Sequence, residues 1–128
     1  MRIHIVEDDI LLLKTLAFKL TKEGHTLVSS KNGFDAIEYL KENEPDLILT
    51  DIMMPFINGL EIISFVRNEK KSKVPIIVMS SAGVEKTVLE AFELGADDFI
   101  TKPFSPNELS IRIKKIFIRL WDKKLSSS

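Results

Sequence analysis

The chain contains no cysteine, almost no net charge and no long apolar segment. Without cysteine it can form neither disulfides nor thiolate metal sites, which fits the reducing cytoplasm, where we expect it to act. Its 18 basic and 19 acidic side chains leave a net charge of −1, so no bulk field favours nucleic acid or an anionic membrane. No apolar run approaches the roughly 20 residues of a membrane-spanning helix. We therefore expect neither direct nucleic-acid binding nor membrane attachment.

Internal repeats, a low-complexity linker and a signal peptide are also missing. The first residues already form a strand pattern with acidic residues from position 7 onward, unlike a secretory signal. The 128 residues, 45% of them hydrophobic, suffice for one domain with a single core. We expect that domain over residues 1–122, and a disordered tail or the start of a linker over residues 123–128.

Short apolar runs alternate with helical patterns along the whole chain. We expect strands near residues 2–6, 25–29, 46–50, 75–80 and 98–101. We expect helices near residues 10–22, 33–43, 59–70, 84–94 and 106–121. This alternation predicts an α/β fold, a doubly wound five-stranded parallel sheet with helices on both faces. The flavodoxin-like strand order 2-1-3-4-5 is the arrangement we expect.

Four of the expected strands end in polar side chains. The first runs into Glu7 and Asp8, the third into Asp51, the fourth into Ser80 and the fifth into Lys102. Parallel strands bring these ends to one edge of the sheet, where open α/β sheets bind ligands. In the expected order the first and third strands are neighbours. The pattern therefore predicts an acidic pocket with one lysine and one hydroxyl.

Three carboxylates in one pocket favour a bound cation. They would repel one another, and at least one would have a raised pKa, unless a positive ion joined them. Mg2+ binds through oxygen ligands and leaves room for a phosphate oxygen. Lys102 adds a charge and Ser80 a hydroxyl for an oxyanion, while an aspartate can form an acyl phosphate. The pocket is suited to phosphoryl transfer, where positioning and charge neutralisation dominate.

A single acidic residue after a strand is usually a helix cap or a loop residue. We keep that structural interpretation for Asp9 alone, because it lies where the first helix needs its N-cap. For the other acids, their occurrence together in this order favours a site.

The residues of this edge belong to longer motifs spread over most of the chain, from about residue 2 to about residue 121. They are Val6-Glu7-Asp8-Asp9, Thr50-Asp51-Ile52-Met53-Met54-Pro55 with Asn58-Gly59, Met79-Ser80-Ser81-Ala82, Gly95-Ala96-Asp97-Asp98-Phe99, and Lys102-Pro103-Phe104. With these motifs the chain resembles the receiver domain of bacterial two-component response regulators. It is closest in pattern to the receivers of winged-helix transcriptional regulators.

The resemblance implies a role for each residue of the edge. Asp51 would accept a phosphoryl group from a sensor histidine kinase. Glu7, Asp8, Asp51 and the backbone carbonyl of Met53 would hold Mg2+, or Mn2+ in its place. Lys102, Ser80 and Ser81 would contact the phosphoryl group, and the bond to Pro103 would be cis. The domain would be no enzyme, but a phosphoacceptor that assists its own phosphorylation and slow dephosphorylation.

The resemblance also implies a switch made of Ser80 and Phe99. The hydroxyl would move toward the phosphate, drawn by its added charge, and the aromatic ring would turn inward behind it. Serine in place of the commoner threonine keeps the donor. The alternative for Phe99 is a static aromatic of the strand.

The last helix has two apolar sides. Leu109, Ile113, Ile116, Phe117 and Leu120 recur at helical spacing and should face the sheet. Ile111 and Ile118 lie on nearly the opposite side, beside basic residues, and indicate a contact surface.

The fourth helix allows two registers. Periodicity alone would bury Val84, Val88 and Phe92. The family register turns Val88, Leu89 and Phe92 toward partners and leaves Ala91 and Leu94 inside. We favour the family register, because the other would expose Leu94.

The resemblance implies a homodimer through the fourth helix, fifth strand and fifth helix. Its expected contact residues are Val88, Leu89, Phe92, Asp97, Asp98, Glu108, Ile111, Arg112 and Arg119. Val88 departs from the dimerising subfamily, which usually carries a basic residue there. One ion pair to Glu108 would be missing, but exposed pairs contribute only about 0–1 kcal/mol. The output would be transcription regulation, or direct protein contact by a stand-alone receiver.

Three other functions compete with this hypothesis. A phosphatase of the haloacid dehalogenase type would need an aspartate two residues after its nucleophile, where this chain has Met53. A flavodoxin-like cofactor binder is disfavoured, because three acids would repel the FMN phosphate. A pseudo-receiver that only binds proteins would be expected to lack one of the acids or Lys102, and all are present.

Overall fold

The computed structural model describes residues 1–81 and 83–127, with side chains described as far as Lys124. Its strands are β1 (Arg2–Val6), β2 (Thr26–Ser30), β3 (Leu47–Asp51), β4 (Ile76–Ser81) and β5 (Asp98–Lys102). Its helices are α1 (Ile10–Lys22), α2 (Gly33–Glu42), α3 (Gly59–Ser64), the π-helical turn η1 (Phe65–Glu69), α4 (Glu85–Leu94) and α5 (Pro106–Ser127). Every expected element is present.

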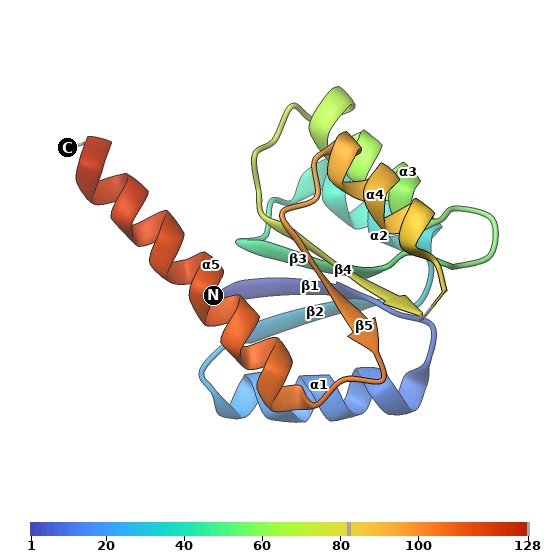
Figure 1. Ribbon diagram of the computed structural model, residues 1–128, viewed down its shortest axis with the longest axis horizontal. Helices are drawn as coiled ribbons and strands as arrows, with labels where there is room; N and C mark the ends of the chain where they lie inside the picture. Colours follow the sequence, from blue (N-terminus) through green and yellow to red (C-terminus); the bar gives the residue numbers. More distant parts are fainter. Residues whose placement is uncertain (82, 128) are drawn as a thin grey trace.

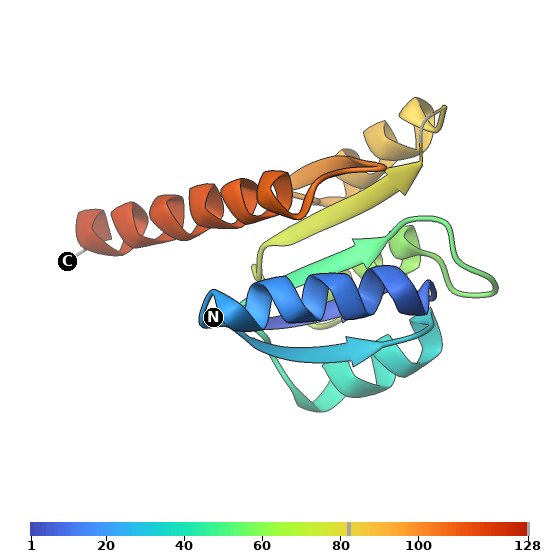
Figure 2. The same ribbon diagram turned by 90° about the horizontal axis from the view of Figure 1, so that it is seen from below.

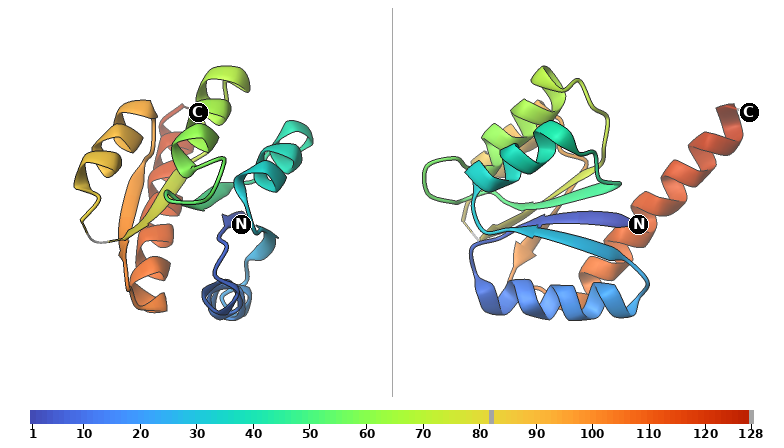
Figure 3. Two further views of the ribbon diagram at one scale, coloured as in Figure 1. Left: turned by 90° about the vertical axis from the view of Figure 1, so that its right-hand side faces the viewer. Right: turned by 180° about the vertical axis from the view of Figure 1, so that it is seen from behind.

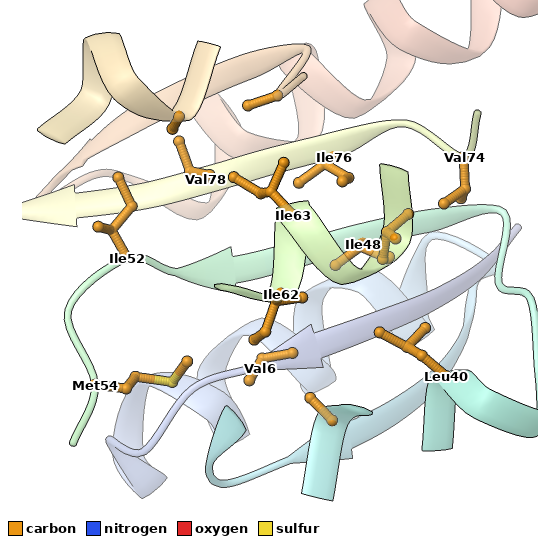
Figure 4. Close-up of a cluster of buried hydrophobic side chains, with 14 residues drawn as sticks. Val6, Leu40, Ile48, Ile52, Met54, Ile62, Ile63, Val74, Ile76 and Val78 are labelled. Carbon is orange, nitrogen blue, oxygen red and sulfur yellow. The ribbon is translucent and has the colours of Figure 1, made fainter. Parts of the chain in front are cut away.

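The sheet has the expected topology. Its strands lie in the order β2-β1-β3-β4-β5, and all neighbouring pairs are parallel (Figure 1). Successive side chains of a strand point to opposite faces of a sheet. On β1, Ile3 and Ile5 therefore pack toward α1 and α5, whereas Val6 packs toward α2, α3 and α4. The two helical layers lie on opposite sides of the sheet (Figure 3), and the core on the α3 side is drawn in Figure 4.

The helix after β3 changes geometry halfway along. Its first part is α-helical, and Lys70 N then donates to Phe65 O at 3.0 Å, a bond that spans five residues. The π turn carries Arg67, whose guanidinium donates to the carbonyl oxygens of Gly95 and Ser72 and pairs with Asp97 at 3.0 Å. Such turns are invisible in hydrophobic spacing, because one inserted residue shifts the pattern only locally.

The last helix runs past the sheet. Leu109, Ile113 and Ile116 are buried as expected. Phe117 and Leu120, however, are 52% and 39% exposed, so the expectation that they face the sheet was wrong. The helix continues to Ser127 and projects beyond the end of the sheet near the N-terminus, where no strand is left to cover (Figure 2).

The boundary expected after residue 122 falls within this helix and stays a prediction; Ala82 and Ser128 lie outside the described residues. None of the helices in the described ranges has the length and apolar character needed to cross a membrane.

Candidate functional site

Three acidic side chains meet where β1 and β3 end. The two strands are hydrogen-bonded neighbours with Val6 opposite Thr50, which places the residues after Val6 beside Asp51. Carboxylate oxygens of Glu7, Asp8 and Asp51 all lie within 4.8 Å of one another. Glu7 and Asp51 are buried, and Asp8 is exposed. The acidic pocket expected from the strand order is therefore present, open to solvent on the side of Asp8.

The side chain of Lys102 closes the pocket on the side of β4 and β5. Lys102, at the end of β5, reaches across β4 and donates from Nζ to Glu7 Oε1 at 2.5 Å and to Asp51 Oδ2 at 3.0 Å. The Lys102–Pro103 peptide bond is cis, as the sequence motif implies. Lys102 is 95 positions away from Glu7 in the sequence and 51 positions away from Asp51, and the three side chains form one charged cluster.

Burial and pairing act in opposite directions on these groups. Burial raises the pKa of Glu7 above its usual value, although hydrogen bonds from Lys102 and from the Asp9 backbone lower it in part. For Lys102, burial lowers the pKa, but the hydrogen bonds to Glu7 and Asp51 outweigh it and leave the pKa raised. The lysine therefore stays charged, and its charge compensates only part of the negative charge of three carboxylates.

Each buried carboxylate is held by donors on both oxygens. Glu7 Oε2 accepts from the backbone N–H of Asp9 at 3.1 Å, while Oε1 is taken by Lys102. Asp51 Oδ1 accepts from the backbone N–H of Met53 at 3.2 Å, while Oδ2 faces Lys102. Asp9 caps α1 through Leu12 N at 3.1 Å, which confirms its structural role. The orientation of the two buried acids is consequently fixed before any ligand binds.

The loop after β3 folds back onto the strand end that carries Asp51. Gly59 N donates to Ile52 O at 2.8 Å, and a Cβ atom at Gly59 would lie 2.5 Å from Asp51 O. Only glycine permits so close an approach without a shift of the backbone. Asn58 and Glu61 form a capping box at the start of α3, which holds this glycine in place. The spacing of Asn58 and Glu61 in the sequence could have predicted that box, and we missed it.

The expected switch residues lie beside the acidic pocket. Ser80 is buried at the end of β4, and Ser81 is exposed. Phe99 is half-buried, with its ring edge-to-face against Phe92 of α4 at 5.9 Å between centroids. A pocket of about 240 Å³ lies between Ser80, Val88 and Phe99. There is thus free volume between the serine and the aromatic ring.

The expected contact face on α4 and α5 is exposed, and part of its charge is already paired. In α4, Ala91 is buried and Leu94 packs on the core, while Leu89 and Phe92 are exposed, as the family register predicts. Ile111 of α5 is exposed, as its helical spacing predicts. Val88 is half-buried against the core, and Arg119 is exposed.

The remaining charges of that face bind within the chain. Asp98 pairs with Arg112 at 3.0 Å, and Arg112 also contacts Glu108 at 3.5 Å. Asp97 is held by Arg67 and by Ile76 N, so its carboxylate supports the fold.

Known proteins share this sequence pattern and this fold. A putative response regulator from Chloroflexus aurantiacus is 30% identical, with 90% of this chain and 95% of that one covered and a TM-score of 0.83. The receiver domain of a signal transduction histidine kinase from Syntrophus aciditrophicus is 30% identical, with 89% and 87% covered and a TM-score of 0.81. A response regulator receiver domain from Francisella is 27% identical, with 93% and 98% covered and a TM-score of 0.84.

Receivers from different kinds of protein match about equally well, so the closer likeness to winged-helix regulators stays a prediction. The sequence-family model of the response regulator receiver domain matches residues 3–114, which is most of the chain. Receiver domains are phosphoacceptor signalling domains, not classical enzymes; they bind a divalent metal in an acidic pocket and work with a histidine kinase. The chain belongs to the family of response regulator receiver domains.

Proposed function

We propose that Asp51 is the phosphoacceptor of a phosphorelay switch. The observation that carries this proposal is the convergence of Glu7, Asp8, Asp51 and Lys102 Nζ at one edge of the sheet. One oxygen of Asp51 would form a bond to phosphorus as the bond to the donor's histidine nitrogen breaks, and that nitrogen would keep the electron pair. Asp51 suits this role better than Asp8, because it belongs to the acidic cluster and also accepts a hydrogen bond from Lys102 Nζ.

The donor set of the pocket fits a hard divalent cation. Glu7, Asp8, Asp51 and the backbone carbonyl of Met53 offer oxygen ligands only, and one lysine does not balance their charge. Mg2+, or Mn2+ in its place, would neutralise the phosphoryl oxygens as charge develops on them. Besides offering a ligand to the cation, Glu7 would hold Lys102 in position, because it accepts a short hydrogen bond from the lysine ammonium group.

Lys102 and the serines would read the modification. Phosphorylation adds about −1.5 to −2 charges and three acceptor oxygens at Asp51. Lys102 Nζ already lies 3.0 Å from Asp51 Oδ2 and can turn to a phosphoryl oxygen without leaving Glu7. Ser80 and Ser81 would donate hydrogen bonds from their hydroxyls at the end of β4 to the phosphoryl oxygens. The pocket between Ser80 and Phe99 gives the aromatic ring room to move inward.

Labelling by a small phosphodonor tests this function. We expect acetyl phosphate with Mg2+ to add one phosphoryl group per chain, measured by intact mass, and EDTA to prevent the addition because the pocket then lacks its cation. Heat-denatured protein is the control, since it keeps all carboxylates but not their arrangement. A folded chain that gains no phosphoryl group at saturating Mg2+ would contradict the proposal.

The readout we propose is dimerisation through α4, β5 and α5, in transcription regulation or in a stand-alone receiver. The exposed side chains of Leu89, Phe92 and Ile111 support an apolar contact. Of the two arginines expected at this contact, Arg112 is paired with Asp98. Arg119 is exposed and forms no ion pair with the described side chains, so it is available to a partner.

Beryllofluoride with Mg2+, which stands in for the phosphoryl group, should therefore shift the chain from monomer to dimer in sedimentation velocity. Ile111→Ser should weaken that dimer at least about tenfold, because a central apolar contact is worth more than 1 kcal/mol. Leu11→Ser, a change of an equally exposed apolar residue on α1, is the matched control. Equal dimerisation of all three proteins would place the interface elsewhere.

A further inference from the structure

Two exposed aromatic rings border the acidic pocket on the side away from α5. Phe56, in the loop between β3 and α3, is fully exposed, and Phe34, in the first turn of α2, is 63% exposed. Between them lies a groove of about 490 Å³. We call it the aromatic groove and define it by Asp8, Lys31, Phe34, Asp35, Phe56 and Ile57. Neither ring belongs to the two hydrophobic cores.

The walls of the aromatic groove are joined through the backbone. A Cβ atom at Gly33 would lie 2.4 Å from Ile57 O, so the start of α2 rests directly on the loop after β3. Asn32 caps α2 by accepting from Asp35 N at 2.8 Å, and its amide donates to Asp35 Oδ2 at 3.2 Å. These contacts hold Phe34 at a set distance from the opposite loop, and the groove is a built feature of the fold.

Phe56 occupies a backbone conformation that a large side chain rarely adopts. Its φ is 68°, in the left-handed region that favours glycine. The ring gains no burial within the domain that would offset this strain. Strained positions of this kind concentrate at functional sites. The loop between β3 and α3, which carries Phe56, projects past the end of the sheet (Figures 1 and 2).

The aromatic groove is continuous with the site of phosphoryl transfer. Asp8 belongs to both, as a lining residue of the groove and as a member of the acidic cluster. A protein that brings its phosphohistidine to Asp51 has to cover this edge of the sheet, and its surface then passes over the groove. The two carboxylates of the groove, Asp8 and Asp35, outnumber its one cation, Lys31, so the groove attracts a basic partner surface.

We propose that the aromatic groove is a docking site for the histidine kinase that phosphorylates Asp51. The kinase would insert an apolar side chain between Phe34 and Phe56 and place a basic side chain near Asp35. This inference rests on the proposed function. Aromatic side chains, phenylalanine among them, are enriched at protein interfaces, and aromatic anchors that fill a pocket carry much of the binding energy there. The groove would thus contribute to the choice of kinase, while the acidic cluster performs the transfer.

Phe56→Gly is the variant that separates docking from folding. Glycine adopts a φ of 68° without strain, so the variant should be no less stable than the wild type in urea unfolding. Phe34→Ser removes the other ring. Phe117→Ser removes an exposed ring from the far end of the sheet and is the matched control.

The measurement is the ratio of two labelling rates for each protein. One donor is the autophosphorylated kinase domain that labels the wild type fastest among the histidine kinases of the source organism, and the other is acetyl phosphate. We expect Phe56→Gly and Phe34→Ser to lower the ratio of kinase rate to acetyl phosphate rate at least about tenfold, and Phe117→Ser to leave it unchanged.

An unchanged ratio in both groove variants would overturn the docking site and leave the function of Asp51 intact. A wild-type chain that neither donor labels would overturn the proposed function, and the docking site with it.

Discussion

Replacing Asp51 by asparagine should abolish phosphorylation by acetyl phosphate and by any phosphohistidine donor. The amide has nearly the same shape, but its oxygen carries no charge and cannot form a stable acyl phosphate. Asparagine would also present an N–H2 group where Lys102 and the cation require a carboxylate oxygen. We expect less than about one hundredth of the wild-type labelling rate, since loss of a nucleophile removes the chemical step itself.

The test needs a control for charge and one for folding. Asp122→Asn removes one exposed carboxylate from α5, far from the acidic pocket, and should label like the wild type. Unfolding in urea should show that Asp51→Asn is folded, because the substitution relieves repulsion that Asp51 exerts on Glu7. Stoichiometric labelling of Asp51→Asn would mean that another carboxylate is the acceptor, and Asp8 would be examined first.

Mild acid should destabilise the fold through His4. The imidazole lies on β1, between β2 and β3, with no exposed surface, and Nε2 shares a 2.7 Å hydrogen bond with Ser30 Oγ. Its ring packs on Tyr39 at 4.5 Å between centroids, and Nδ1 has no partner within the described part of the chain. Burial lowers the pKa of His4 from 6.5 to about 4. The neutral ring is therefore the form that the folded chain accepts.

The sign of the effect follows from proton uptake. As the pH falls below about 6.5, His4 becomes protonated in the unfolded chain, whereas in the folded chain it stays neutral until about pH 4. Unfolding is favoured over that range, and the whole difference amounts to roughly 3 kcal/mol. Glu7 acts in the opposite direction: its raised pKa lets the folded chain take up a proton first, which stabilises the fold as the pH falls toward 4.5.

A non-titrating variant isolates the histidine. His4→Gln keeps a hydrogen-bonding group near Ser30 and has the same acids as the wild type. Urea unfolding from about pH 7.5 to about pH 4.5 should show the wild type losing roughly 2–3 kcal/mol more than His4→Gln. His25→Gln is the matched control, since it removes the other histidine, which is only half-buried. Parallel curves for the wild type and His4→Gln would show that His4 does not control the acid response.

Most of the acidic pocket could be predicted from strand ends. Glu7, Asp8 and Asp51 are adjacent because β1 and β3 pair in register, as the flavodoxin-like order expected for this chain requires. The family match then decides against two of the competing functions. A model that matches residues 3–114 as a receiver excludes the aspartate-nucleophile phosphatase and the flavodoxin-like cofactor binder as descriptions of this chain.

Side-chain pairing across the sheet could not be predicted in the same way. Spacing along the sequence does not show that Lys102 crosses β4 to bond Glu7, or that Glu7 is wholly buried. Nor does it show that Asp97 is bound by Arg67, since that contact depends on a π turn in another element. Most of the charged residues expected at the dimer contact are paired within the chain.

The sequence by itself determined the alternating strands and helices of a parallel sheet and the set of groups at its carboxyl edge, whereas the expected strand order is confirmed by the structure. These depend on local periodicity and on the direction of parallel strands, which are properties of short segments. Only the tertiary structure decided where α5 leaves the sheet, how Glu7 and Lys102 share a charge, and that Phe34 and Phe56 face each other across a groove. Those features depend on distances between segments far apart in the chain, which are set by packing against the common core.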